Sequence, residues 1–289
     1  MLAVYEKELK SYFRSPVGTV FIGLFLLVSA VLLVFGYLLT GYVQYTGYLY
    51  YLNLVFMLTI PILTMRTLSE ERKTKTDQLL LTSPLKASDI VIGKYLAAVT
   101  VLLITLVIHS LDAFVISLYS TNMYALDIIV GYIGLFIVGC AYIAVGIFVS
   151  STTTNQVISA IVTFAVFALI YGVQLLTTSV VSSVTSGIIV CAVIALLVVA
   201  LIYSTTKNKV AAACTLIVEA LAIALVAVID INVYAGLLNT FLTWISLLER
   251  FSEYLSGSVS LSSFVYLISF SFVFVYMTIY QVEKRRWVG

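Results

Sequence analysis

The sequence predicts an all-α, polytopic membrane protein with about eight transmembrane helices. Of its 289 residues, 62% are hydrophobic and 10% are charged, and the mean hydropathy is +1.16. About a quarter of the residues in soluble domains are charged, so this composition cannot cover a water-facing surface. The apolar residues fall in runs long enough to cross about 30 Å of hydrocarbon as helices. Because no polar interval is long enough for a soluble domain, we expect one membrane domain over residues 1–289.

The first segment, residues 1–16, is predicted to form an amphipathic elbow helix at the membrane surface. Its apolar residues, among them Tyr5 and Leu9, share one helical face, and the Lys and Arg side chains on the rest of the helix can reach water. Pro16 ends the elbow. The apolar run Val17–Leu39 is longer than the core of a cleaved signal peptide, about 7–15 residues, so we interpret it as a retained span.

Eight apolar runs have the length and composition of transmembrane helices. In chain order they cover residues 17–39, 48–65, 90–118, 128–149, 156–178, 187–204, 209–230 and 261–281. An even number of crossings places both termini on one side of the membrane. With this assignment all 15 Lys and Arg residues except Arg250 fall on that side, which the positive-inside rule identifies as the cytoplasm.

The segment Tyr234–Leu255 is expected to lie in the outer membrane face without crossing it. Its apolar residues repeat every three or four positions, but Glu249, Arg250 and Glu253 make it a poor span. If it crossed, the basic residues 284–286 would lie outside, against the positive-inside rule. We therefore expect an amphipathic or re-entrant helix here.

The longest charged interval lies between the second and third predicted spans. Ser69 is placed to cap a helix whose first turn carries Glu70 and Glu71, where acidic residues suit the helix dipole. An apolar patch over residues 76–81 follows, and Pro84 ends the helix. A short charged helix at the membrane surface can transmit force to the spans. The alternative is a solvated connector that only obeys the positive-inside rule, and the residues by themselves favour neither.

This interval also carries a resemblance to a known family. Residues 70–84 read EERKTKTDQLLLTSP and are followed by Gly93-Lys94. The run resembles the signature of the type-2 ABC exporter permeases, which has two acids, two basic residues, a small residue, Gly-Thr, a leucine run, a proline and a later Gly-Lys. The elbow sequence Tyr5–Lys10 adds to the resemblance. Lys75 stands where that family usually has glycine.

The C-terminal region is similar to one branch of these permeases, related to gliding-motility and nitrous-oxide-reductase-maturation permeases. The matching residues are Phe251, Gly257, Val259, Leu261, Tyr266 and Arg285-Arg286-Trp287. Eight spans exceed the six that are usual for the fold. Residues 187–230 therefore look like an extra hairpin inserted before the last span.

The resemblance implies the permease subunit of an ATP-driven exporter in the bacterial plasma membrane, with both termini in the cytoplasm. It would form a homodimer, or a heterodimer with a related permease, and dock separate ABC ATPase subunits through residues 69–86. The implied contacts are Glu70, Glu71, Arg72, Lys73, Thr76, Leu79, Leu80 and Pro84. A second contact is implied at the polar turn 150–155.

We expect no catalytic residue, cofactor or metal in this chain, and ATP with its Mg²⁺ would be bound by the partner. The chain has no phosphate-binding loop, because Gly93-Lys94 is followed by Tyr95 and lacks the upstream glycine. Its energy source would therefore be a separate nucleotide-binding protein.

Three ionisable residues inside predicted spans are candidates for the polar lining of a translocation path. His109 and Asp112 lie three residues apart on one helical face, and Glu219 is near the middle of the seventh span. A charged side chain at mid-bilayer costs about 2.5–3.5 kcal/mol, so such residues usually face protein or water. The alternative is structural: a His109–Asp112 hydrogen bond, and a Glu219 that is protonated or paired.

Two other classes of function remain open. A membrane-embedded enzyme that modifies lipids would need converging acid, base or metal-ligating groups, for which one histidine and no paired intramembrane carboxylates are a poor basis. A passive channel or a scaffold would not need an ATPase-binding helix. If the chain is an exporter, its apolar interior favours lipidic, peptide or other amphiphilic cargo over small ions.

Overall fold

The computed structural model describes residues 1–39, 45–76, 85–117, 125–179 and 235–288, and short pieces between residues 184 and 226. The secondary structure of these residues is helical throughout. The chain divides into two compact units. Unit 1 consists of Met1–Ile170 and Leu247–Gly289, and unit 2 is Tyr171–Ser246.

Within the described part of the chain, six helices are long and apolar enough to cross a membrane, which confirms a multi-pass, all-α architecture. Six of the eight predicted spans are therefore helices of the required length. The other two, residues 187–204 and 209–230, have much of their length outside the described residues and stay predictions. The six segments cover Pro16–Leu38, Tyr45–Lys73, Ala87–Ile116, Ala125–Thr152, Gln156–Leu175 and Leu261–Arg286. The second segment includes a long helix, Tyr45–Thr64, and a short one, Ser69–Lys73.

The chain begins with α1 (Leu2–Arg14), followed by α2 (Pro16–Leu33), which the π-helical η1 (Val34–Leu38) prolongs. Ser15 has an extended backbone between the two helices. Pro16 takes the first position of α2, where an N–H would have no intrahelical partner. The predicted helix and the break at Pro16 are therefore present, and the position of α1 in a membrane stays a prediction.

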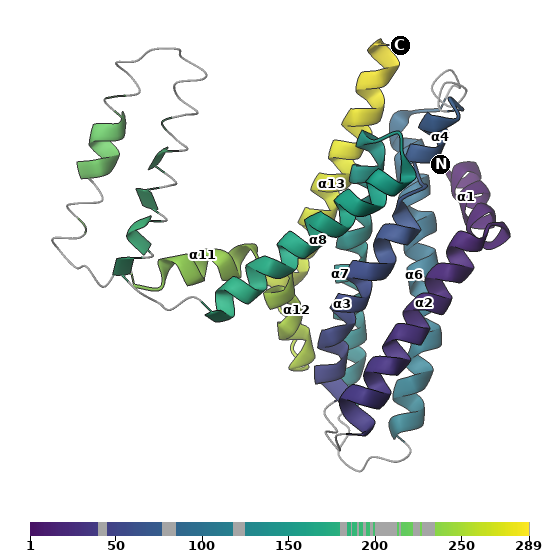
Figure 1. Ribbon diagram of the computed structural model, residues 1–289, viewed down its shortest axis with the longest axis horizontal. Helices are drawn as coiled ribbons and strands as arrows, with labels where there is room; N and C mark the ends of the chain where they lie inside the picture. The colour runs from purple at the N-terminus through teal and green to yellow at the C-terminus, as the bar shows by residue number, and fades with distance from the viewer. Residues whose placement is uncertain are drawn as a thin grey trace. The chain divides into compact units, whose positions relative to one another are not determined.

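Unit 1 is packed around α7 (Ala125–Thr152), as Figure 1 shows. Glycines on α7 let its neighbours approach. A Cβ atom on Gly134 would lie 2.6 Å from Tyr254, and one on Gly146 would overlap Thr64. Small residues are the usual means of close packing between membrane helices. The neighbours of α7 are α3 (Tyr45–Thr64), α6 (Ala87–Ser117), α12 (Leu247–Leu255) and α13 (Leu261–Val288).

The segment expected to be amphipathic or re-entrant, residues 234–255, is not one continuous helix, and its position at the outer membrane face stays a prediction. The structure has two helices, α11 (Leu237–Ile245) and α12, separated at Ser246, whose backbone is extended. The apolar spacing continues across this break, so side-chain periodicity could not reveal it. In unit 1, α12 packs against α7 through a buried face. That face consists of Leu247, Leu248, Phe251 and Tyr254.

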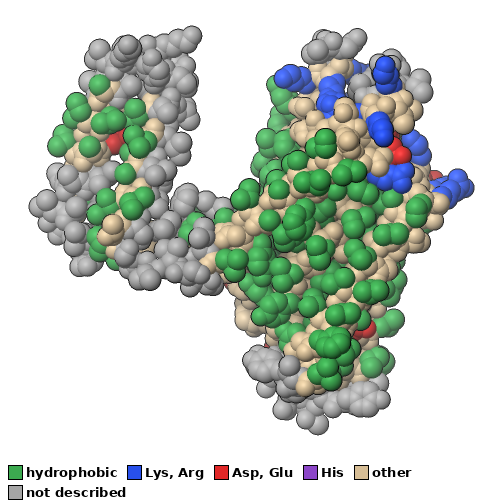
Figure 2. Space-filling model, viewed as in Figure 1, with side chains coloured by type: hydrophobic (Ala, Val, Ile, Leu, Met, Phe, Trp, Pro, Cys, Tyr) green, Lys and Arg blue, Asp and Glu red, His purple; other side chains and the backbone are tan. Residues whose placement is uncertain are grey.

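Apart from Arg250 on α12, the described Lys and Arg side chains of unit 1 gather at one end, called here the cationic end (Figure 2). There lie α1, α4 (Ser69–Lys73) and the C-terminal part of α13 (Figure 1). Because α13 continues to Val288, the basic residues 284–286 are carried on a helix. Arg286 Nη1 donates to the carbonyl of Leu85 at 3.3 Å. The remaining described helix, α8, covers Gln156–Ser179.

Candidate functional site

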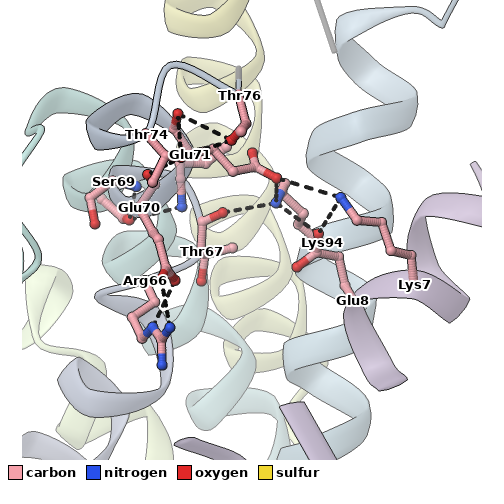
Figure 3. Close-up of polar contacts among 12 residues, drawn as sticks. Lys7, Glu8, Arg66, Thr67, Ser69, Glu70, Glu71, Thr74, Thr76 and Lys94 are labelled. Carbon is pink, nitrogen blue, oxygen red and sulfur yellow. Dashed lines mark hydrogen bonds and ion pairs between the residues drawn. The ribbon is translucent and has the colours of Figure 1, made fainter. Parts of the chain in front are cut away.

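The candidate site lies at the cationic end, where α4 follows α3 (Figure 3). As expected, the first turn of α4 carries Glu70 and Glu71. The expected cap by Ser69 is wrong, because Leu68 is the N-cap residue and makes no side-chain hydrogen bond. The Ser69 hydroxyl instead donates back to the carbonyl of Met65. The helix is therefore started by groups outside its own sequence.

Ser150 of α7 supplies the cap. Its fully buried hydroxyl accepts hydrogen bonds from the backbone amides of Leu68 and Ser69, both at 3.1 Å. The same hydroxyl donates to the carbonyl of Met65 at 3.2 Å. The first amides of a helix have no intrahelical acceptor, so this contact fixes the start of α4 to α7. Sequence could not predict it, since 81 residues separate Ser69 from Ser150.

Lys94 of α6 is buried at the centre of the site, with a side chain that is 1% exposed. Its ammonium donates to Glu8 Oε1 of α1 at 3.0 Å, to Glu71 Oε1 of α4 at 2.9 Å and to the carbonyl of Thr67 at 2.9 Å (Figure 3). A lysine ammonium has three N–H donors, and each has an acceptor here. One cation thus joins α1, α4 and α6.

Lys7 brings a second cation to the same two carboxylates. Its Nζ lies 3.9 Å from Glu8 Oε1 and 4.0 Å from Glu71 Oε1. Because the Lys7 side chain is 65% exposed, water screens both contacts and they are weak. These contacts form a group called here the Lys94 cluster, in which two cations balance two anions. Its members are Lys7, Lys94, Glu8 and Glu71. In the buried part of the cluster every Lys94 donor has an acceptor, which fixes the geometry of α1, α4 and α6.

The close approach of α1 to α6 depends on Gly93. A Cβ atom at this position would lie 3.1 Å from the Val4 Cβ and 3.2 Å from the carbonyl oxygen of Met1. The pair Gly93-Lys94 therefore serves helix packing and the ion cluster. Further along α1, the buried Tyr12 hydroxyl lies 3.2 Å from Thr67 Oγ1. Burial raises the pKa of this phenol, so it stays neutral and holds α1 by hydrogen bonding.

Two arginines make further contacts that hold α4 in place. Arg66 precedes α4, and Arg72 belongs to it. Arg66 donates to both carboxylate oxygens of Glu70, at 2.7 Å and 2.6 Å, in the bidentate geometry that arginine favours. Arg72 Nη1 donates to the carbonyls of Ser151, at 2.5 Å, and Thr153, at 2.9 Å. These carbonyls lie at the C-terminal end of α7, where a cation is favourable. The polar turn 150–155 thus contacts α4 itself.

The expectation of one helix from residue 69 to Pro84 is wrong, because α4 ends at Lys73 and the chain leaves it through a left-handed turn at Lys75, whose φ is 57°. This is where glycine is usual in the permeases that the sequence resembles. A non-glycine residue in this conformation is strained by about 1–2 kcal/mol. The turn is made without glycine, and it leaves a short exposed surface. That surface consists of Lys73, Thr74, Lys75 and Thr76.

The predicted contact residues fall into three groups. Glu70, Glu71 and Arg72 are occupied with contacts inside unit 1. Lys73 and Thr76 are exposed. Leu79, Leu80 and Pro84 lie outside the described residues. The sequence did not mark four residues that hold α4 in place. They are Glu8, Arg66, Lys94 and Ser150. The sequence covered three of them only as members of a longer pattern: Glu8 in the elbow sequence 5–10, Lys94 in the Gly-Lys pair and Ser150 in the polar turn 150–155.

His109 lies in a separate buried network of tyrosines. Its Nε2 is 2.8 Å from the Tyr48 hydroxyl, and its Nδ1 is 2.8 Å from the Tyr132 hydroxyl. Tyr132 is in turn 2.9 Å from the Tyr45 hydroxyl, and Tyr48 donates to the carbonyl of Ser29 at 3.1 Å. The network joins α2, α3, α6 and α7. Both ring nitrogens of His109, which is 0% exposed, have a partner.

The structural alternative, a His109–Asp112 hydrogen bond, is not formed. Asp112 Oδ2 is 3.8 Å from His109 Nε2, beyond hydrogen-bond distance, and its side chain is 36% exposed. The tyrosines approach both ring nitrogens more closely than Asp112 does, because they come from facing helices and Asp112 shares the helix of His109. Glu219 lies in unit 2 and is half-buried. Within unit 1, His109 and Asp112 therefore lie near each other but share no hydrogen bond.

Part of the chain is similar to a known protein family. A family whose description reads ABC-2 family transporter protein matches residues 18–208, about two thirds of the chain. The match begins in α2 and includes the whole described part of the candidate site except α1. No curated protein matches the chain. The matched residues stop before α12 and α13, where the branch resemblance was found.

Proposed function

The chain belongs to the ABC-2 family of transporter proteins, and from this premise we propose that it is the permease subunit of an ATP-driven exporter. Permeases of this family are membrane subunits of ABC transporters and are not themselves ATPases. Membership in the family implies association with ABC ATPase subunits. Docking through residues 69–86, ATP and Mg²⁺ bound by that partner, and export as the direction of transport are parts of the proposal.

One observation carries the proposed coupling role: α4 is held on its inner side and exposed at its end. On the inner side, Glu71 binds Lys94 and the start of the helix binds Ser150. At the end, Lys73 and the following turn face solvent. A segment that only connected two spans would not need bonds to α1, α6 and α7. A segment that transmits movement needs both an exposed end, which the ATPase can contact, and fixed contacts with the membrane helices.

In the proposed mechanism, ATP-driven movement of the ATPases displaces the exposed end of α4. The Lys94 cluster passes the displacement to α1 and α6, and the bonds of Ser150 and Arg72 pass it to α7. Packed helices change between discrete arrangements as rigid bodies. The spans would thereby alternate between two states that open to opposite sides of the membrane.

The cargo and the assembly follow from weaker arguments. The largely apolar spans favour an amphiphilic substrate, and Asp112 and Glu219 remain candidates for polar lining of its path. His109 is enclosed by tyrosines, so we assign it to support of the helix bundle. We propose a homodimer, or a heterodimer with a related permease, in a bacterial plasma membrane, with both termini cytoplasmic. Resemblance to the gliding-motility and nitrous-oxide-reductase-maturation branch supports this assembly.

Docking is tested by co-purification with the cognate ATPase. We expect Lys73→Glu to reduce the amount of ATPase retained at least about tenfold, because it reverses an exposed charge at the proposed interface. The matched control is Lys284→Glu, which reverses an exposed charge on α13 at the same end. The double change Leu79→Asp, Leu80→Asp should abolish retention. Retention of the ATPase by all three variants would refute docking through residues 69–86.

Coupling is tested separately, by ATPase activity and transport in vesicles. We expect Glu71→Gln to keep ATPase binding and to lower ATP-dependent transport at least about tenfold, since it weakens the bond between α4 and α6. A passive channel would show flux without ATP, and a lipid-modifying enzyme would turn over labelled lipid without ATP. Either result would replace the exporter proposal with its rival.

A further inference from the structure

A shallow groove of about 450 Å³ runs along the exposed side of α1. Pockets that hold small ligands are usually about 300–1,000 Å³, so the groove is large enough for a lipid headgroup. Its walls combine three cationic side chains with two hydroxyls. They are Lys7, Lys10, Arg14, Ser11 and Ser15.

Several donors in the groove have no partner among the residues that the structure describes. Arg14 makes no ion pair or hydrogen bond with any residue in the described ranges, and the same is true of the Ser11 and Ser15 hydroxyls. Lys10 lies 3.7 Å from Glu6 Oε2, and Lys7 belongs to the Lys94 cluster, with its Nζ 3.9 Å from Glu8 Oε1. The groove therefore has an excess of positive charge, with its most available donors at the Arg14 end.

The position of the groove favours a membrane lipid as the occupant. Arg14 and Ser15 directly precede Pro16, where the first membrane-spanning helix begins. The groove is thus at the level where a helix passes from water into lipid. Large apolar side chains are exposed on both sides of this boundary. The acyl chains of a lipid can pack against them, whereas a free phosphate has no apolar part that could. They are Phe13 on α1, and Val20 and Leu27 on α2.

We propose that this groove binds the phosphate-bearing headgroup of an anionic phospholipid. Arg14 and Lys10 pair with the phosphate, the Ser11 and Ser15 hydroxyls donate to its oxygens, and the acyl chains lie along the exposed apolar side of α2. An arginine fork binds a phosphate through two parallel N–H···O bonds, and hydroxyls beside it can donate to the remaining phosphate oxygens. The bound lipid would hold α1 at the membrane surface beside the Lys94 cluster.

The test measures lipid retained by the purified full-length chain in detergent, by native mass spectrometry. The probe is phosphatidylglycerol, compared with phosphatidylcholine of the same acyl chains. The variant is Lys10→Gln, Arg14→Gln, and the matched control is Lys73→Gln, Lys75→Gln, which removes the same charge from the same end. Neither pair includes a member of the Lys94 cluster, so loss of lipid is distinguishable from loss of coupling.

Each cation near an anionic lipid surface strengthens binding about fivefold, so we expect the variant to bind phosphatidylglycerol roughly 25-fold more weakly. The control should stay within about twofold of the wild type, and phosphatidylcholine should bind at least about tenfold more weakly. Equal loss in both variants, or no loss in either, would overturn the site. Displacement of the lipid by glycerol phosphate or inorganic phosphate at equal concentration would overturn the lipid as the ligand. If the double variant does not fold, Arg14→Gln alone carries the same comparison, with about a fivefold effect expected.

Discussion

The Lys94 ammonium and the Glu71 carboxylate lie 2.9 Å apart, although 23 residues separate them along the chain. Lys94 belongs to α6 and Glu71 to the short helix α4, so the bond fixes an exposed segment to a long apolar helix. Glu8 of α1 completes the arrangement at 3.0 Å. Because all three side chains are largely buried, each depends on the others for its charge to be tolerated.

Replacement of Lys94 by methionine should destabilise unit 1 strongly. It leaves the Glu8 and Glu71 carboxylates facing each other without their buried cation, and breaking a buried ion pair in this way costs about 3–5 kcal/mol. Denaturant unfolding in detergent measures the loss. Lys73→Met, at an exposed position of α4, is the control and should change stability by less than about 0.5 kcal/mol. Equal stability of the two variants would contradict the role of Lys94.

Replacement of Ser150 by alanine should loosen the start of α4. The backbone amides of Leu68 and Ser69 lose a buried acceptor, at a cost of about 1–3 kcal/mol. The control is Ser151→Ala, whose hydroxyl, among the described residues, donates to the carbonyl of Phe148 in its own helix. Hydrogen exchange at the amides of residues 68–74 should accelerate in the first variant only. If Ser151→Ala accelerates hydrogen exchange at these amides as much as Ser150→Ala does, the cap does not come from Ser150.

Replacement of Lys75 by glycine should stabilise the turn after α4. The φ of 57° is strained for lysine by about 1–2 kcal/mol and is unstrained for glycine. Part of this gain is offset because glycine gives the unfolded chain more freedom. Lys73→Gly, within the helix, should destabilise by about 1 kcal/mol. Opposite shifts in exchange protection at residues 70–76 are expected, and shifts of the same sign would disagree with the left-handed turn.

Replacement of Gly146 by alanine should disturb the contact between α7 and α3. The added Cβ would overlap the Thr64 side chain, and overpacking of this kind costs about 1–3 kcal/mol. The control is Gly23→Ala on α2, where no atom lies within 4 Å of the new methyl group. That change should raise stability by up to about 1 kcal/mol, through helix propensity alone. Thermal unfolding of the two variants, compared with wild type, decides the sign of each effect.

Replacement of Tyr132 by phenylalanine tests the partner of His109. It removes the hydroxyl at 2.8 Å from His109 Nδ1, and an unsatisfied buried group costs about 1–3 kcal/mol. Asp112→Asn should change stability by less than about 0.5 kcal/mol, since its carboxylate makes no hydrogen bond to the ring. Unfolding in denaturant compares them. A larger loss in the aspartate variant would mean that the ion pair holds His109.

The membrane architecture could be predicted from sequence to a large extent. Six predicted spans are helices whose bounds differ by a few residues from those expected, except that α13 runs on to Val288. The reason is physical: in hydrocarbon every backbone amide needs an internal acceptor, so a long apolar run has to be helical. The gathering of Lys and Arg at one end could also be predicted from the sequence, because it follows from where these residues stand between the apolar runs.

The candidate site could be predicted only as a segment. The acidic first turn and the family resemblance pointed to residues 69–86, but the residues that hold α4 come from elsewhere in the chain. Periodicity also continued through Ser246, where the backbone breaks between α11 and α12. Such features depend on which helix faces lie together, and local sequence does not encode that.

The sequence alone therefore determined which segments are helices long enough to span a membrane and at which end the charges gather, because hydropathy and residue order act locally. Tertiary packing alone decided that Lys94 lies between Glu8 and Glu71 and that Ser150 caps a helix 81 residues away. Glycines at the helix contacts bring these segments within hydrogen-bond distance, and buried polar groups then take the partners that packing places beside them.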